Sequence, residues 1–137
     1  VAEYPYVLEK LEDKTGDNGL VAMVALNENS LFTLERSYLN DLKKNVIRVY
    51  KVDLTSATDV SHLDAIKNQS YQVAKKELVI DFKDIADAVS EKRLDNMEAM
   101  TLGPILPNGN PTLIFVSDNN FSKHQRTLFI ALEVVIN

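Results

Sequence analysis

The chain contains no cysteine and only two histidines. The absence of cysteine excludes disulfide bonds, thiolate metal sites and a cysteine nucleophile, but it does not fix the compartment, because many exported proteins also lack cysteine. His62 and His124 lie far apart in the sequence and match no metal-binding spacing such as HExxH. A GxSxG nucleophile elbow is also missing, so Ser117 or Ser122 paired with His124 has little support as a serine hydrolase site.

Long hydrophobic runs are missing too. The longest apolar run covers residues 20–26, whereas a membrane-spanning helix needs roughly 18 apolar residues or more. We therefore expect no membrane span. No signal peptide is visible at the N-terminus. Because the chain begins with Val1 rather than Met, we expect that a preceding segment was removed or is not included.

Clusters of basic residues are scarce. The 137 residues include 15 Lys or Arg and 20 Asp or Glu, which gives a formal net charge of −5, and lysines adjoin only in pairs such as Lys43-Lys44 and Lys75-Lys76. Nucleic acid is therefore a poor match as a partner. The abundance of acidic and amide side chains suits hard cations such as Ca²⁺, which prefer oxygen ligands.

Short β-rich runs separated by polar turns are the main feature that is present. Residues 19–26, 31–37, 46–54 and 77–82 are predicted as four strands of an antiparallel meander. The first of them is apolar throughout, as in a strand that is buried on both faces. A short helix is predicted over residues 84–92 with Asp84 as its N-cap, followed by strands over 96–102, 112–117 and 126–135.

A four-stranded meander followed by a three-stranded one is typical of the end of a β-propeller, whose blades have four antiparallel strands. On this interpretation the fold is all-β, and residues 1–137 form the C-terminal part of a propeller. One blade covers about 19–82 and the last blade about 95–137, while residues 4–11 end an earlier unit. The edges would be covered by the remaining propeller blades or by another copy of the chain. A self-contained β-sandwich is the alternative that the pattern leaves open.

Four ordered motifs carry a resemblance to a known family. They are FTLERSY at 32–38, IRVYKVDLTSATDV at 47–60, LDNMEAM at 94–100 and TLIFVSDNNF at 112–121. Together they resemble the C-terminal half of the phytase-like β-propeller proteins, the family described as "esterase-like activity of phytase", over about residues 20–132. Ala99 departs from the pattern, because the family usually has glycine there, where a positive φ would strain alanine.

The resemblance implies a calcium-dependent hydrolase of phosphate or other esters. It also implies an extracytoplasmic location, periplasmic or secreted, and a small phosphorylated or ester substrate. The alternative is a non-catalytic propeller that binds a ligand or a protein partner, with any calcium purely structural. One scaffold of this kind hosts many unrelated activities.

Glu98 and Arg36 are the predicted catalytic residues. A carboxylate is costly within an apolar strand unless it is paired or bound to metal, and the resemblance implies that Glu98 binds calcium. A salt bridge at the channel rim is the alternative. Arg36 would stabilise a developing oxyanion charge, or it would pair with a neighbouring carboxylate and hold two blades together.

Further metal ligands are predicted beside these two residues. Glu35 precedes Arg36, and Asp95 lies close enough to Glu98 to share its site. Asp118 and Asn119 end the strand at 112–117, where their oxygen atoms can coordinate Ca²⁺ or shape a tight turn. The complete set of predicted metal ligands is Glu98, Glu35, Asp95, Asp118 and Asn119.

Overall fold

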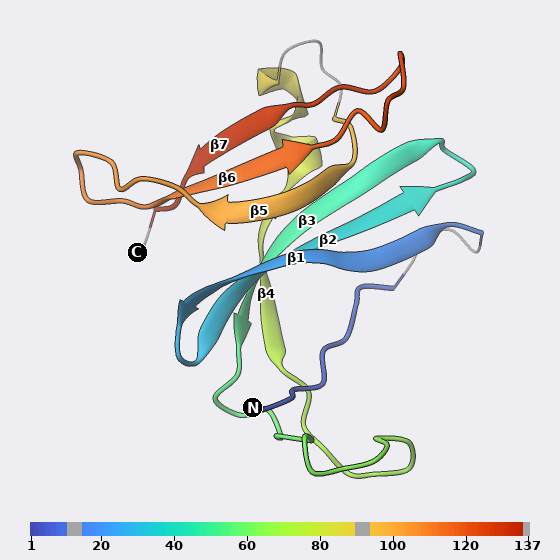
Figure 1. Cartoon of the computed structure of the whole chain (residues 1–137), viewed down its shortest axis with the longest axis vertical. Coiled ribbons are helices and arrows are strands. Elements are labelled where there is room, and N and C mark those ends of the chain that lie inside the picture. Colours follow the sequence, from blue (N-terminus) through green and yellow to red (C-terminus); the bar gives the residue numbers. More distant parts are fainter. Residues whose placement is uncertain (11–14, 90–93, 136–137) are drawn as a thin grey trace.

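The computed structural model describes residues 1–10, 15–89 and 94–135, and its fold is all-β with two antiparallel sheets (Figure 1). The first sheet has the order β1-β2-β3-β4 and the second the order β5-β6-β7. The strands are β1 (Asp17–Asn27), β2 (Ser30–Leu39), β3 (Lys44–Asp53), β4 (Lys75–Asp81), β5 (Met97–Leu102), β6 (Thr112–Ser117) and β7 (Phe129–Glu133). The predicted fold class, a four-stranded and then a three-stranded meander, is confirmed. That each sheet is a propeller blade stays a prediction.

The main hydrophobic core lies where the two sheets face each other. The first sheet contributes Phe32, Leu34, Ile47 and Val49, and the second contributes Met97, Met100, Leu113, Phe115 and Ile130. Phe82 follows β4 and packs edge-on against Phe115, with the ring centroids 5.1 Å apart. Burial of these side chains on both sides of the interface joins the sheets into one body, since each sheet covers the other's apolar face.

The first strand differs from its prediction. We expected residues 19–26 to be buried on both faces, but in β1 partly buried residues alternate with exposed ones, and Met23 is 65% exposed. Val21, Val24 and Leu26 pack against the core. β1 is the edge strand of the first sheet, and Met23 and Ala25 on its face away from the main core are exposed.

The third strand is apolar on both of its faces. Ile47 and Val49 join the main core, whereas Tyr50 and Val52 belong to a second cluster with Ala74. This arrangement agrees with the alternation of side chains along a strand. The first sheet is therefore covered on one face by the second sheet and on the other by a separate small core.

The predicted helix over 84–92 is wrong for the described residues. Two single 3₁₀ turns, η1 (Phe82–Asp84) and η2 (Ala86–Ala88), replace it, and residues 90–92 lie outside the described part. Asp81 caps η1 by accepting a hydrogen bond from the Lys83 backbone N–H (3.1 Å), so Asp84 is not the N-cap. The chain turns early because Phe82 is fully buried and Asp81 is held by the Arg48 guanidinium (3.0 Å).

The N-terminal segment, residues 1–10, has no regular secondary structure and runs beside the long β3–β4 connection (Figure 1). The Val60 N–H donates to the Glu3 carbonyl (2.8 Å), and the Ala74 N–H donates to the Pro5 carbonyl (2.9 Å). The segment is thus fixed at two points. None of the helices in the described ranges is long or apolar enough to cross a membrane.

Candidate functional site

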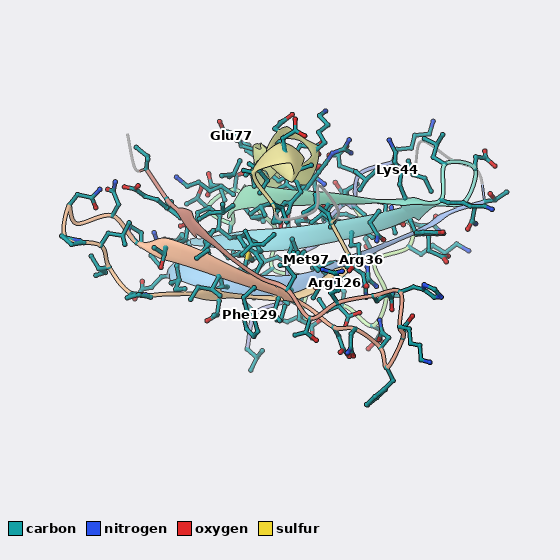
Figure 2. All side chains as sticks on the ribbon, turned by 90° about the horizontal axis from the view of Figure 1, so that it is seen from above. Arg36, Lys44, Glu77, Met97, Arg126 and Phe129 are labelled. Atoms are coloured by element: carbon teal, nitrogen blue, oxygen red, sulfur yellow. The ribbon has the colours of Figure 1, made fainter. Side chains whose placement is uncertain are left out.

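Arg36 and Glu98 form an ion pair between the two sheets. Arg36 lies on β2 and Glu98 on β5, and Arg36 Nη1 is 3.3 Å from Glu98 Oε1. Their side chains are 30% and 37% exposed, so solvent reaches both. Figure 2 shows Arg36 at the level where the second sheet passes the first. The structure therefore brings together the two residues that the sequence singled out for catalysis.

Irregular pairing in two strands accompanies this ion pair. Met97 pairs with Ser117 and Ala99 with Val116, which makes Glu98 the extra residue of a β-bulge. β1 has a similar irregularity between Leu20 and Ala22, beside the residues that pair with β2 at Arg36. A bulge re-aims side chains and locally ends the ladder, and here it directs Glu98 towards Arg36. Ala99 does not have a positive φ, so alanine introduces no backbone strain in place of the family's glycine.

Amide side chains complete the surroundings of Glu98. Asn96 Nδ2 donates to Glu98 Oε1, the same oxygen that faces Arg36. Asn96 Oδ1 in turn accepts a hydrogen bond from Gln125 Nε2 (3.2 Å). Glu98 Oε2 has no hydrogen-bond partner among residues 1–10, 15–89 and 94–135. One oxygen of this carboxylate is therefore fixed and the other is available.

A hollow of about 370 Å³ adjoins the ion pair. Its polar lining comes from Arg36, Tyr38, Asn45, Asn96 and Gln125, together with residues at the start of β1. Glu98 itself does not line this hollow and lies beside Asn96 and Arg36. The arrangement offers an anion the guanidinium of Arg36 and several amide N–H groups, with a carboxylate next to them.

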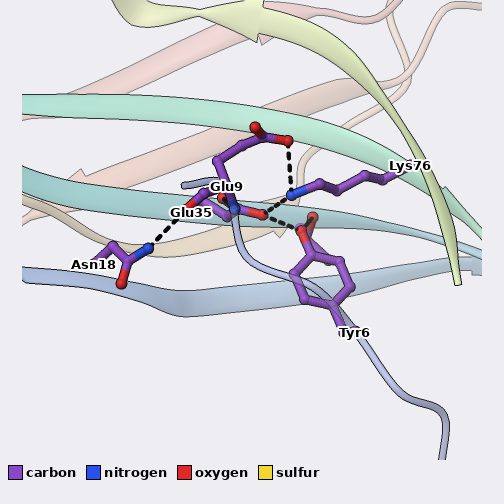
Figure 3. A network of polar contacts seen from close by, with 6 residues as sticks. Tyr6, Glu9, Asn18, Glu35 and Lys76 are labelled. Atoms are coloured by element: carbon purple, nitrogen blue, oxygen red, sulfur yellow. Dashed lines mark hydrogen bonds and ion pairs between the residues drawn. The ribbon is translucent and has the colours of Figure 1, made fainter. Parts of the chain in front are cut away.

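Glu35 lies on the opposite face of β2 from Arg36, because consecutive residues of a strand point to opposite faces. Figure 3 shows it among Tyr6, Glu9 and Lys76. Tyr6 Oη donates to Glu35 Oε1 (2.5 Å), Lys76 Nζ lies 2.6 Å from the same oxygen, and the Glu9 N–H donates to Oε2 (3.0 Å). Lys76 Nζ also sits 4.3 Å from the centre of the Tyr50 ring. The Glu35 site is buried and fully paired.

Burial in this second cluster shifts the titration of its two tyrosines. Burial first, and then the hydrogen bond to Glu35, raises the pKa of Tyr6 well above its ordinary value. Burial and the nearby negative charge of Glu35 raise the pKa of Tyr50 to about 12. Both phenols are thus held in their neutral form, in which Tyr6 donates its hydroxyl hydrogen.

The other predicted ligands lie around the β6–β7 loop. Asp95 is buried and accepts a hydrogen bond from the Arg126 backbone N–H (2.9 Å). Asn119 Oδ1 accepts from the Phe121 N–H (3.1 Å), which closes a tight turn. Asp118 is exposed. The structure therefore sets Asp95 beside Asn96, but it does not gather Glu35, Glu98, Asp95 and Asp118 around one point.

A calcium site requires six to eight oxygen ligands around one ion. Within the part of the chain that the structure describes, no group of three or more acidic or histidine side chains is arranged to hold a metal ion. The guanidinium of Arg36 also lies against the Glu98 carboxylate. The described residues alone do not fit a calcium site.

Two components of these sites were missed by the sequence analysis. Gln125 reaches Asn96 across 29 positions, and Tyr6 reaches Glu35 across 29 positions. Neither residue belongs to a recognisable motif, and no local spacing connects such distant positions. The closeness of Asp95 to Glu98 in the sequence was the local signal that pointed to this part of the site.

Comparison with known proteins completes the description of the chain. No curated protein and no solved structure matches it significantly. One protein-family model, Phytase-like, described as "Esterase-like activity of phytase", matches residues 1–121. The matched range includes both Arg36 and Glu98. The match confirms the resemblance that the motifs suggested. The chain belongs to the phytase-like family.

Proposed function

We propose that the chain carries part of the active site of a hydrolase acting on small phosphate or other esters, with Arg36 as the anion-binding residue. One observation carries the proposal. Arg36 lines the hollow of about 370 Å³ and pairs with Glu98 through Nη1, and its other N–H groups have no partner in the described chain. A guanidinium whose remaining N–H groups are available as donors suits the paired oxygens of a phosphate or carboxylate.

Glu98 supplies the complementary chemistry in this proposal. Its Oε2 accepts a proton from a water molecule, and the water oxygen attacks the phosphorus or carbonyl carbon of an ester held on Arg36. Arg36 stabilises the negative charge that develops on the ester oxygens. The P–O or C–O bond to the leaving alcohol breaks, the alkoxide takes a proton from solvent, and Glu98 releases its own proton to solvent. Every group in this sequence of steps belongs to the chain, the ester or water.

Calcium dependence is a separate part of the proposal. The described carboxylates do not converge, so further ligands would have to come from outside the described residues, and Glu98 Oε2 would then bind the ion in place of accepting the proton of water. Calcium would then supply positive charge that polarises the ester. An extracytoplasmic location and assembly with further propeller blades or another copy of the chain belong to the same family-based proposal.

Hydrolysis of p-nitrophenyl phosphate and p-nitrophenyl acetate tests the proposal, with and without millimolar Ca²⁺. We expect Glu98→Gln to reduce turnover by about 10²–10⁴-fold, the usual contribution of a general base, with the fold retained. Glu133→Gln is the matched control, because Glu133 is also a strand carboxylate that accepts side-chain amides, from Asn108 and Asn110 (2.7 Å each). It should leave turnover unchanged.

The same experiment includes the non-catalytic alternative. If the chain binds inorganic phosphate through Arg36 without hydrolysing either ester, a ligand-binding role replaces the catalytic one. If Glu98→Gln and Glu133→Gln reduce turnover equally, the proposed site is wrong.

A further inference from the structure

We propose that Asn120, Gln125 and Asn96 form an amide relay that positions the Glu98 carboxylate against Arg36. The relay runs from the β6–β7 loop to β5 and ends at the ion pair between the sheets. Asn96 and Gln125 are positioning residues in this inference, since they act through Glu98. Its consequence for turnover rests on the proposed function, whereas the relay itself does not.

The contacts form an unbroken series. Asn120 Nδ2 donates to Gln125 Oε1 (3.1 Å), and Gln125 Nε2 donates to Asn96 Oδ1 (3.2 Å). Asn96 Nδ2 donates to Glu98 Oε1, which also accepts from Arg36 Nη1 at 3.3 Å. Each amide thus donates from its nitrogen to the next residue in the series, and Gln125 and Asn96 also accept at their oxygen from the preceding residue.

The direction of the relay follows from chemistry. An ionised carboxylate only accepts hydrogen bonds, so Asn96 must turn its NH₂ group towards Glu98. Its oxygen then faces Gln125, which must present an NH₂ group in turn, and the Gln125 oxygen faces the NH₂ group of Asn120. The opposite orientation of any amide would place two acceptors against each other. The negative charge of Glu98 therefore fixes the orientation of three amides.

The surroundings hold the relay in place. Asn96 is buried, with 8% of its surface exposed, so an unpaired amide there would be costly. The loop that carries Gln125 is tied down at its end, since Ser117 Oγ donates to the Arg126 carbonyl (2.8 Å) and accepts from the Leu128 N–H (3.1 Å).

The loop tip is also conformationally restricted. Asn120 and Phe121 have φ values of 47° and 54°. Asparagine tolerates this left-handed region. The Phe121 side chain is exposed, and its N–H donates to Asn119 Oδ1 (3.1 Å), which closes the turn locally. This turn sets the backbone from which the Asn120 side chain reaches Gln125.

Two substitutions of one residue test the relay. Gln125→Leu removes both of its hydrogen bonds. Gln125→Glu keeps the shape and the acceptor for Asn120, but it loses the donor and attracts the NH₂ group of Asn96, which turns the Asn96 oxygen towards Glu98. The relay therefore predicts that Gln125→Glu, although it keeps the shape of glutamine, lowers kcat more than Gln125→Leu does. A merely structural role predicts the reverse order.

The first readout is the KM-against-kcat split on the neutral ester p-nitrophenyl acetate, because Gln125 lines the hollow and a new carboxylate there would repel an anionic ester. We expect kcat to fall roughly tenfold in Gln125→Leu and towards 100-fold in Gln125→Glu, with KM within about twofold, because a misplaced catalytic group lowers turnover. A rise in KM with kcat unchanged in both variants would overturn the relay. Asn110→Asp, which adds the same charge beside Glu133, should leave both constants unchanged.

The second readout needs no catalysis. NMR follows the chemical shifts of the Asn96 side-chain NH₂ protons, which report the acceptor that they face. The shifts should change little in Gln125→Leu, where Asn96 still donates to Glu98, and change strongly in Gln125→Glu, where the NH₂ group turns to the new carboxylate. Unchanged shifts in Gln125→Glu, or a larger change in Gln125→Leu, would overturn the relay. If no ester is hydrolysed and the shifts change in the expected order, the proposed function fails and the relay stands.

Discussion

Glu35 and Glu98 are both strand carboxylates paired with a cation, but their environments differ. The Glu35 side chain is 7% exposed and both of its oxygens are occupied, by Lys76, by Tyr6 and by a backbone N–H. The Glu98 side chain is 37% exposed, and within the described parts of the chain only one of its oxygens has a partner. The first arrangement fixes the fold, whereas the second keeps an oxygen and part of a guanidinium for a ligand.

The difference shows how β2 can contribute one residue to the buried ion pair that stabilises the fold and the next residue to the proposed site. Glu35 and Arg36 are neighbours on β2, yet they point to opposite faces of the sheet. The N-terminal segment covers the face that carries Glu35, through Tyr6. The face that carries Arg36 lies against β5 at the bulge of Glu98. A charge on the covered face must be fully paired because it is desolvated, while a charge reached by solvent need not be.

Removal of Lys76 should have the largest effect on stability. Lys76→Met leaves the buried Glu35 carboxylate without its cation, and breaking a buried ion pair typically costs about 3–5 kcal/mol. Urea unfolding measures this loss. Additional replacement of Glu35 by Gln should recover part of it, and no recovery would mean that Lys76 acts through its packing on Tyr6 and Tyr50 alone.

The same substitution at both carboxylates compares them directly. Glu35→Gln forces an NH₂ group against one of the donors around it, so we expect a loss of about 1–3 kcal/mol in the free energy of unfolding. Glu98→Gln should cost less than about 1 kcal/mol, as for other solvent-exposed ion pairs. Equal losses in urea unfolding would contradict the distinction between the two sites.

Loss of the Tyr6 hydroxyl should have a smaller effect. Tyr6→Phe removes the donor to Glu35 and the partner of Thr33 Oγ1 (3.0 Å), which is buried. We expect a loss of about 1–2 kcal/mol. Thermal unfolding measures it, and Tyr4→Phe is the control, because Tyr4 is exposed. A comparable loss in both variants would show that the hydroxyl bonds of Tyr6 contribute nothing specific.

Alkaline pH should weaken the Glu35 cluster by a modest amount. Folding raises the pKa of Tyr50 from 10.0 to about 12, so its contribution to stability is fully present below pH 10 and is lost as the pH rises through the folded value. Urea unfolding at a series of alkaline pH values should show this decline, and Tyr50→Phe should reduce its slope. An unchanged slope would exclude Tyr50 as its source.

The outline of the fold and one half of the site were predictable. Alternating apolar runs and polar turns predicted all seven strands, and the position of Glu98 within an apolar strand marked it as a residue in need of a partner. Asp84 as an N-cap was wrong because burial of Phe82 and the Arg48–Asp81 ion pair end the strand earlier and turn the chain. Such tertiary restraints override a local helical pattern.

The sequence by itself determined the strands, their alternation and the motifs of the family, because these depend on residues close together in the chain. Only the tertiary structure decided that β1 lies at a sheet edge, that Glu35 is buried against Lys76 while Glu98 meets Arg36, and that Gln125 reaches Asn96. These outcomes depend on contacts between segments far apart in the chain. No local period encodes such contacts, since they follow from how the two sheets and the N-terminal segment bury one another's surfaces.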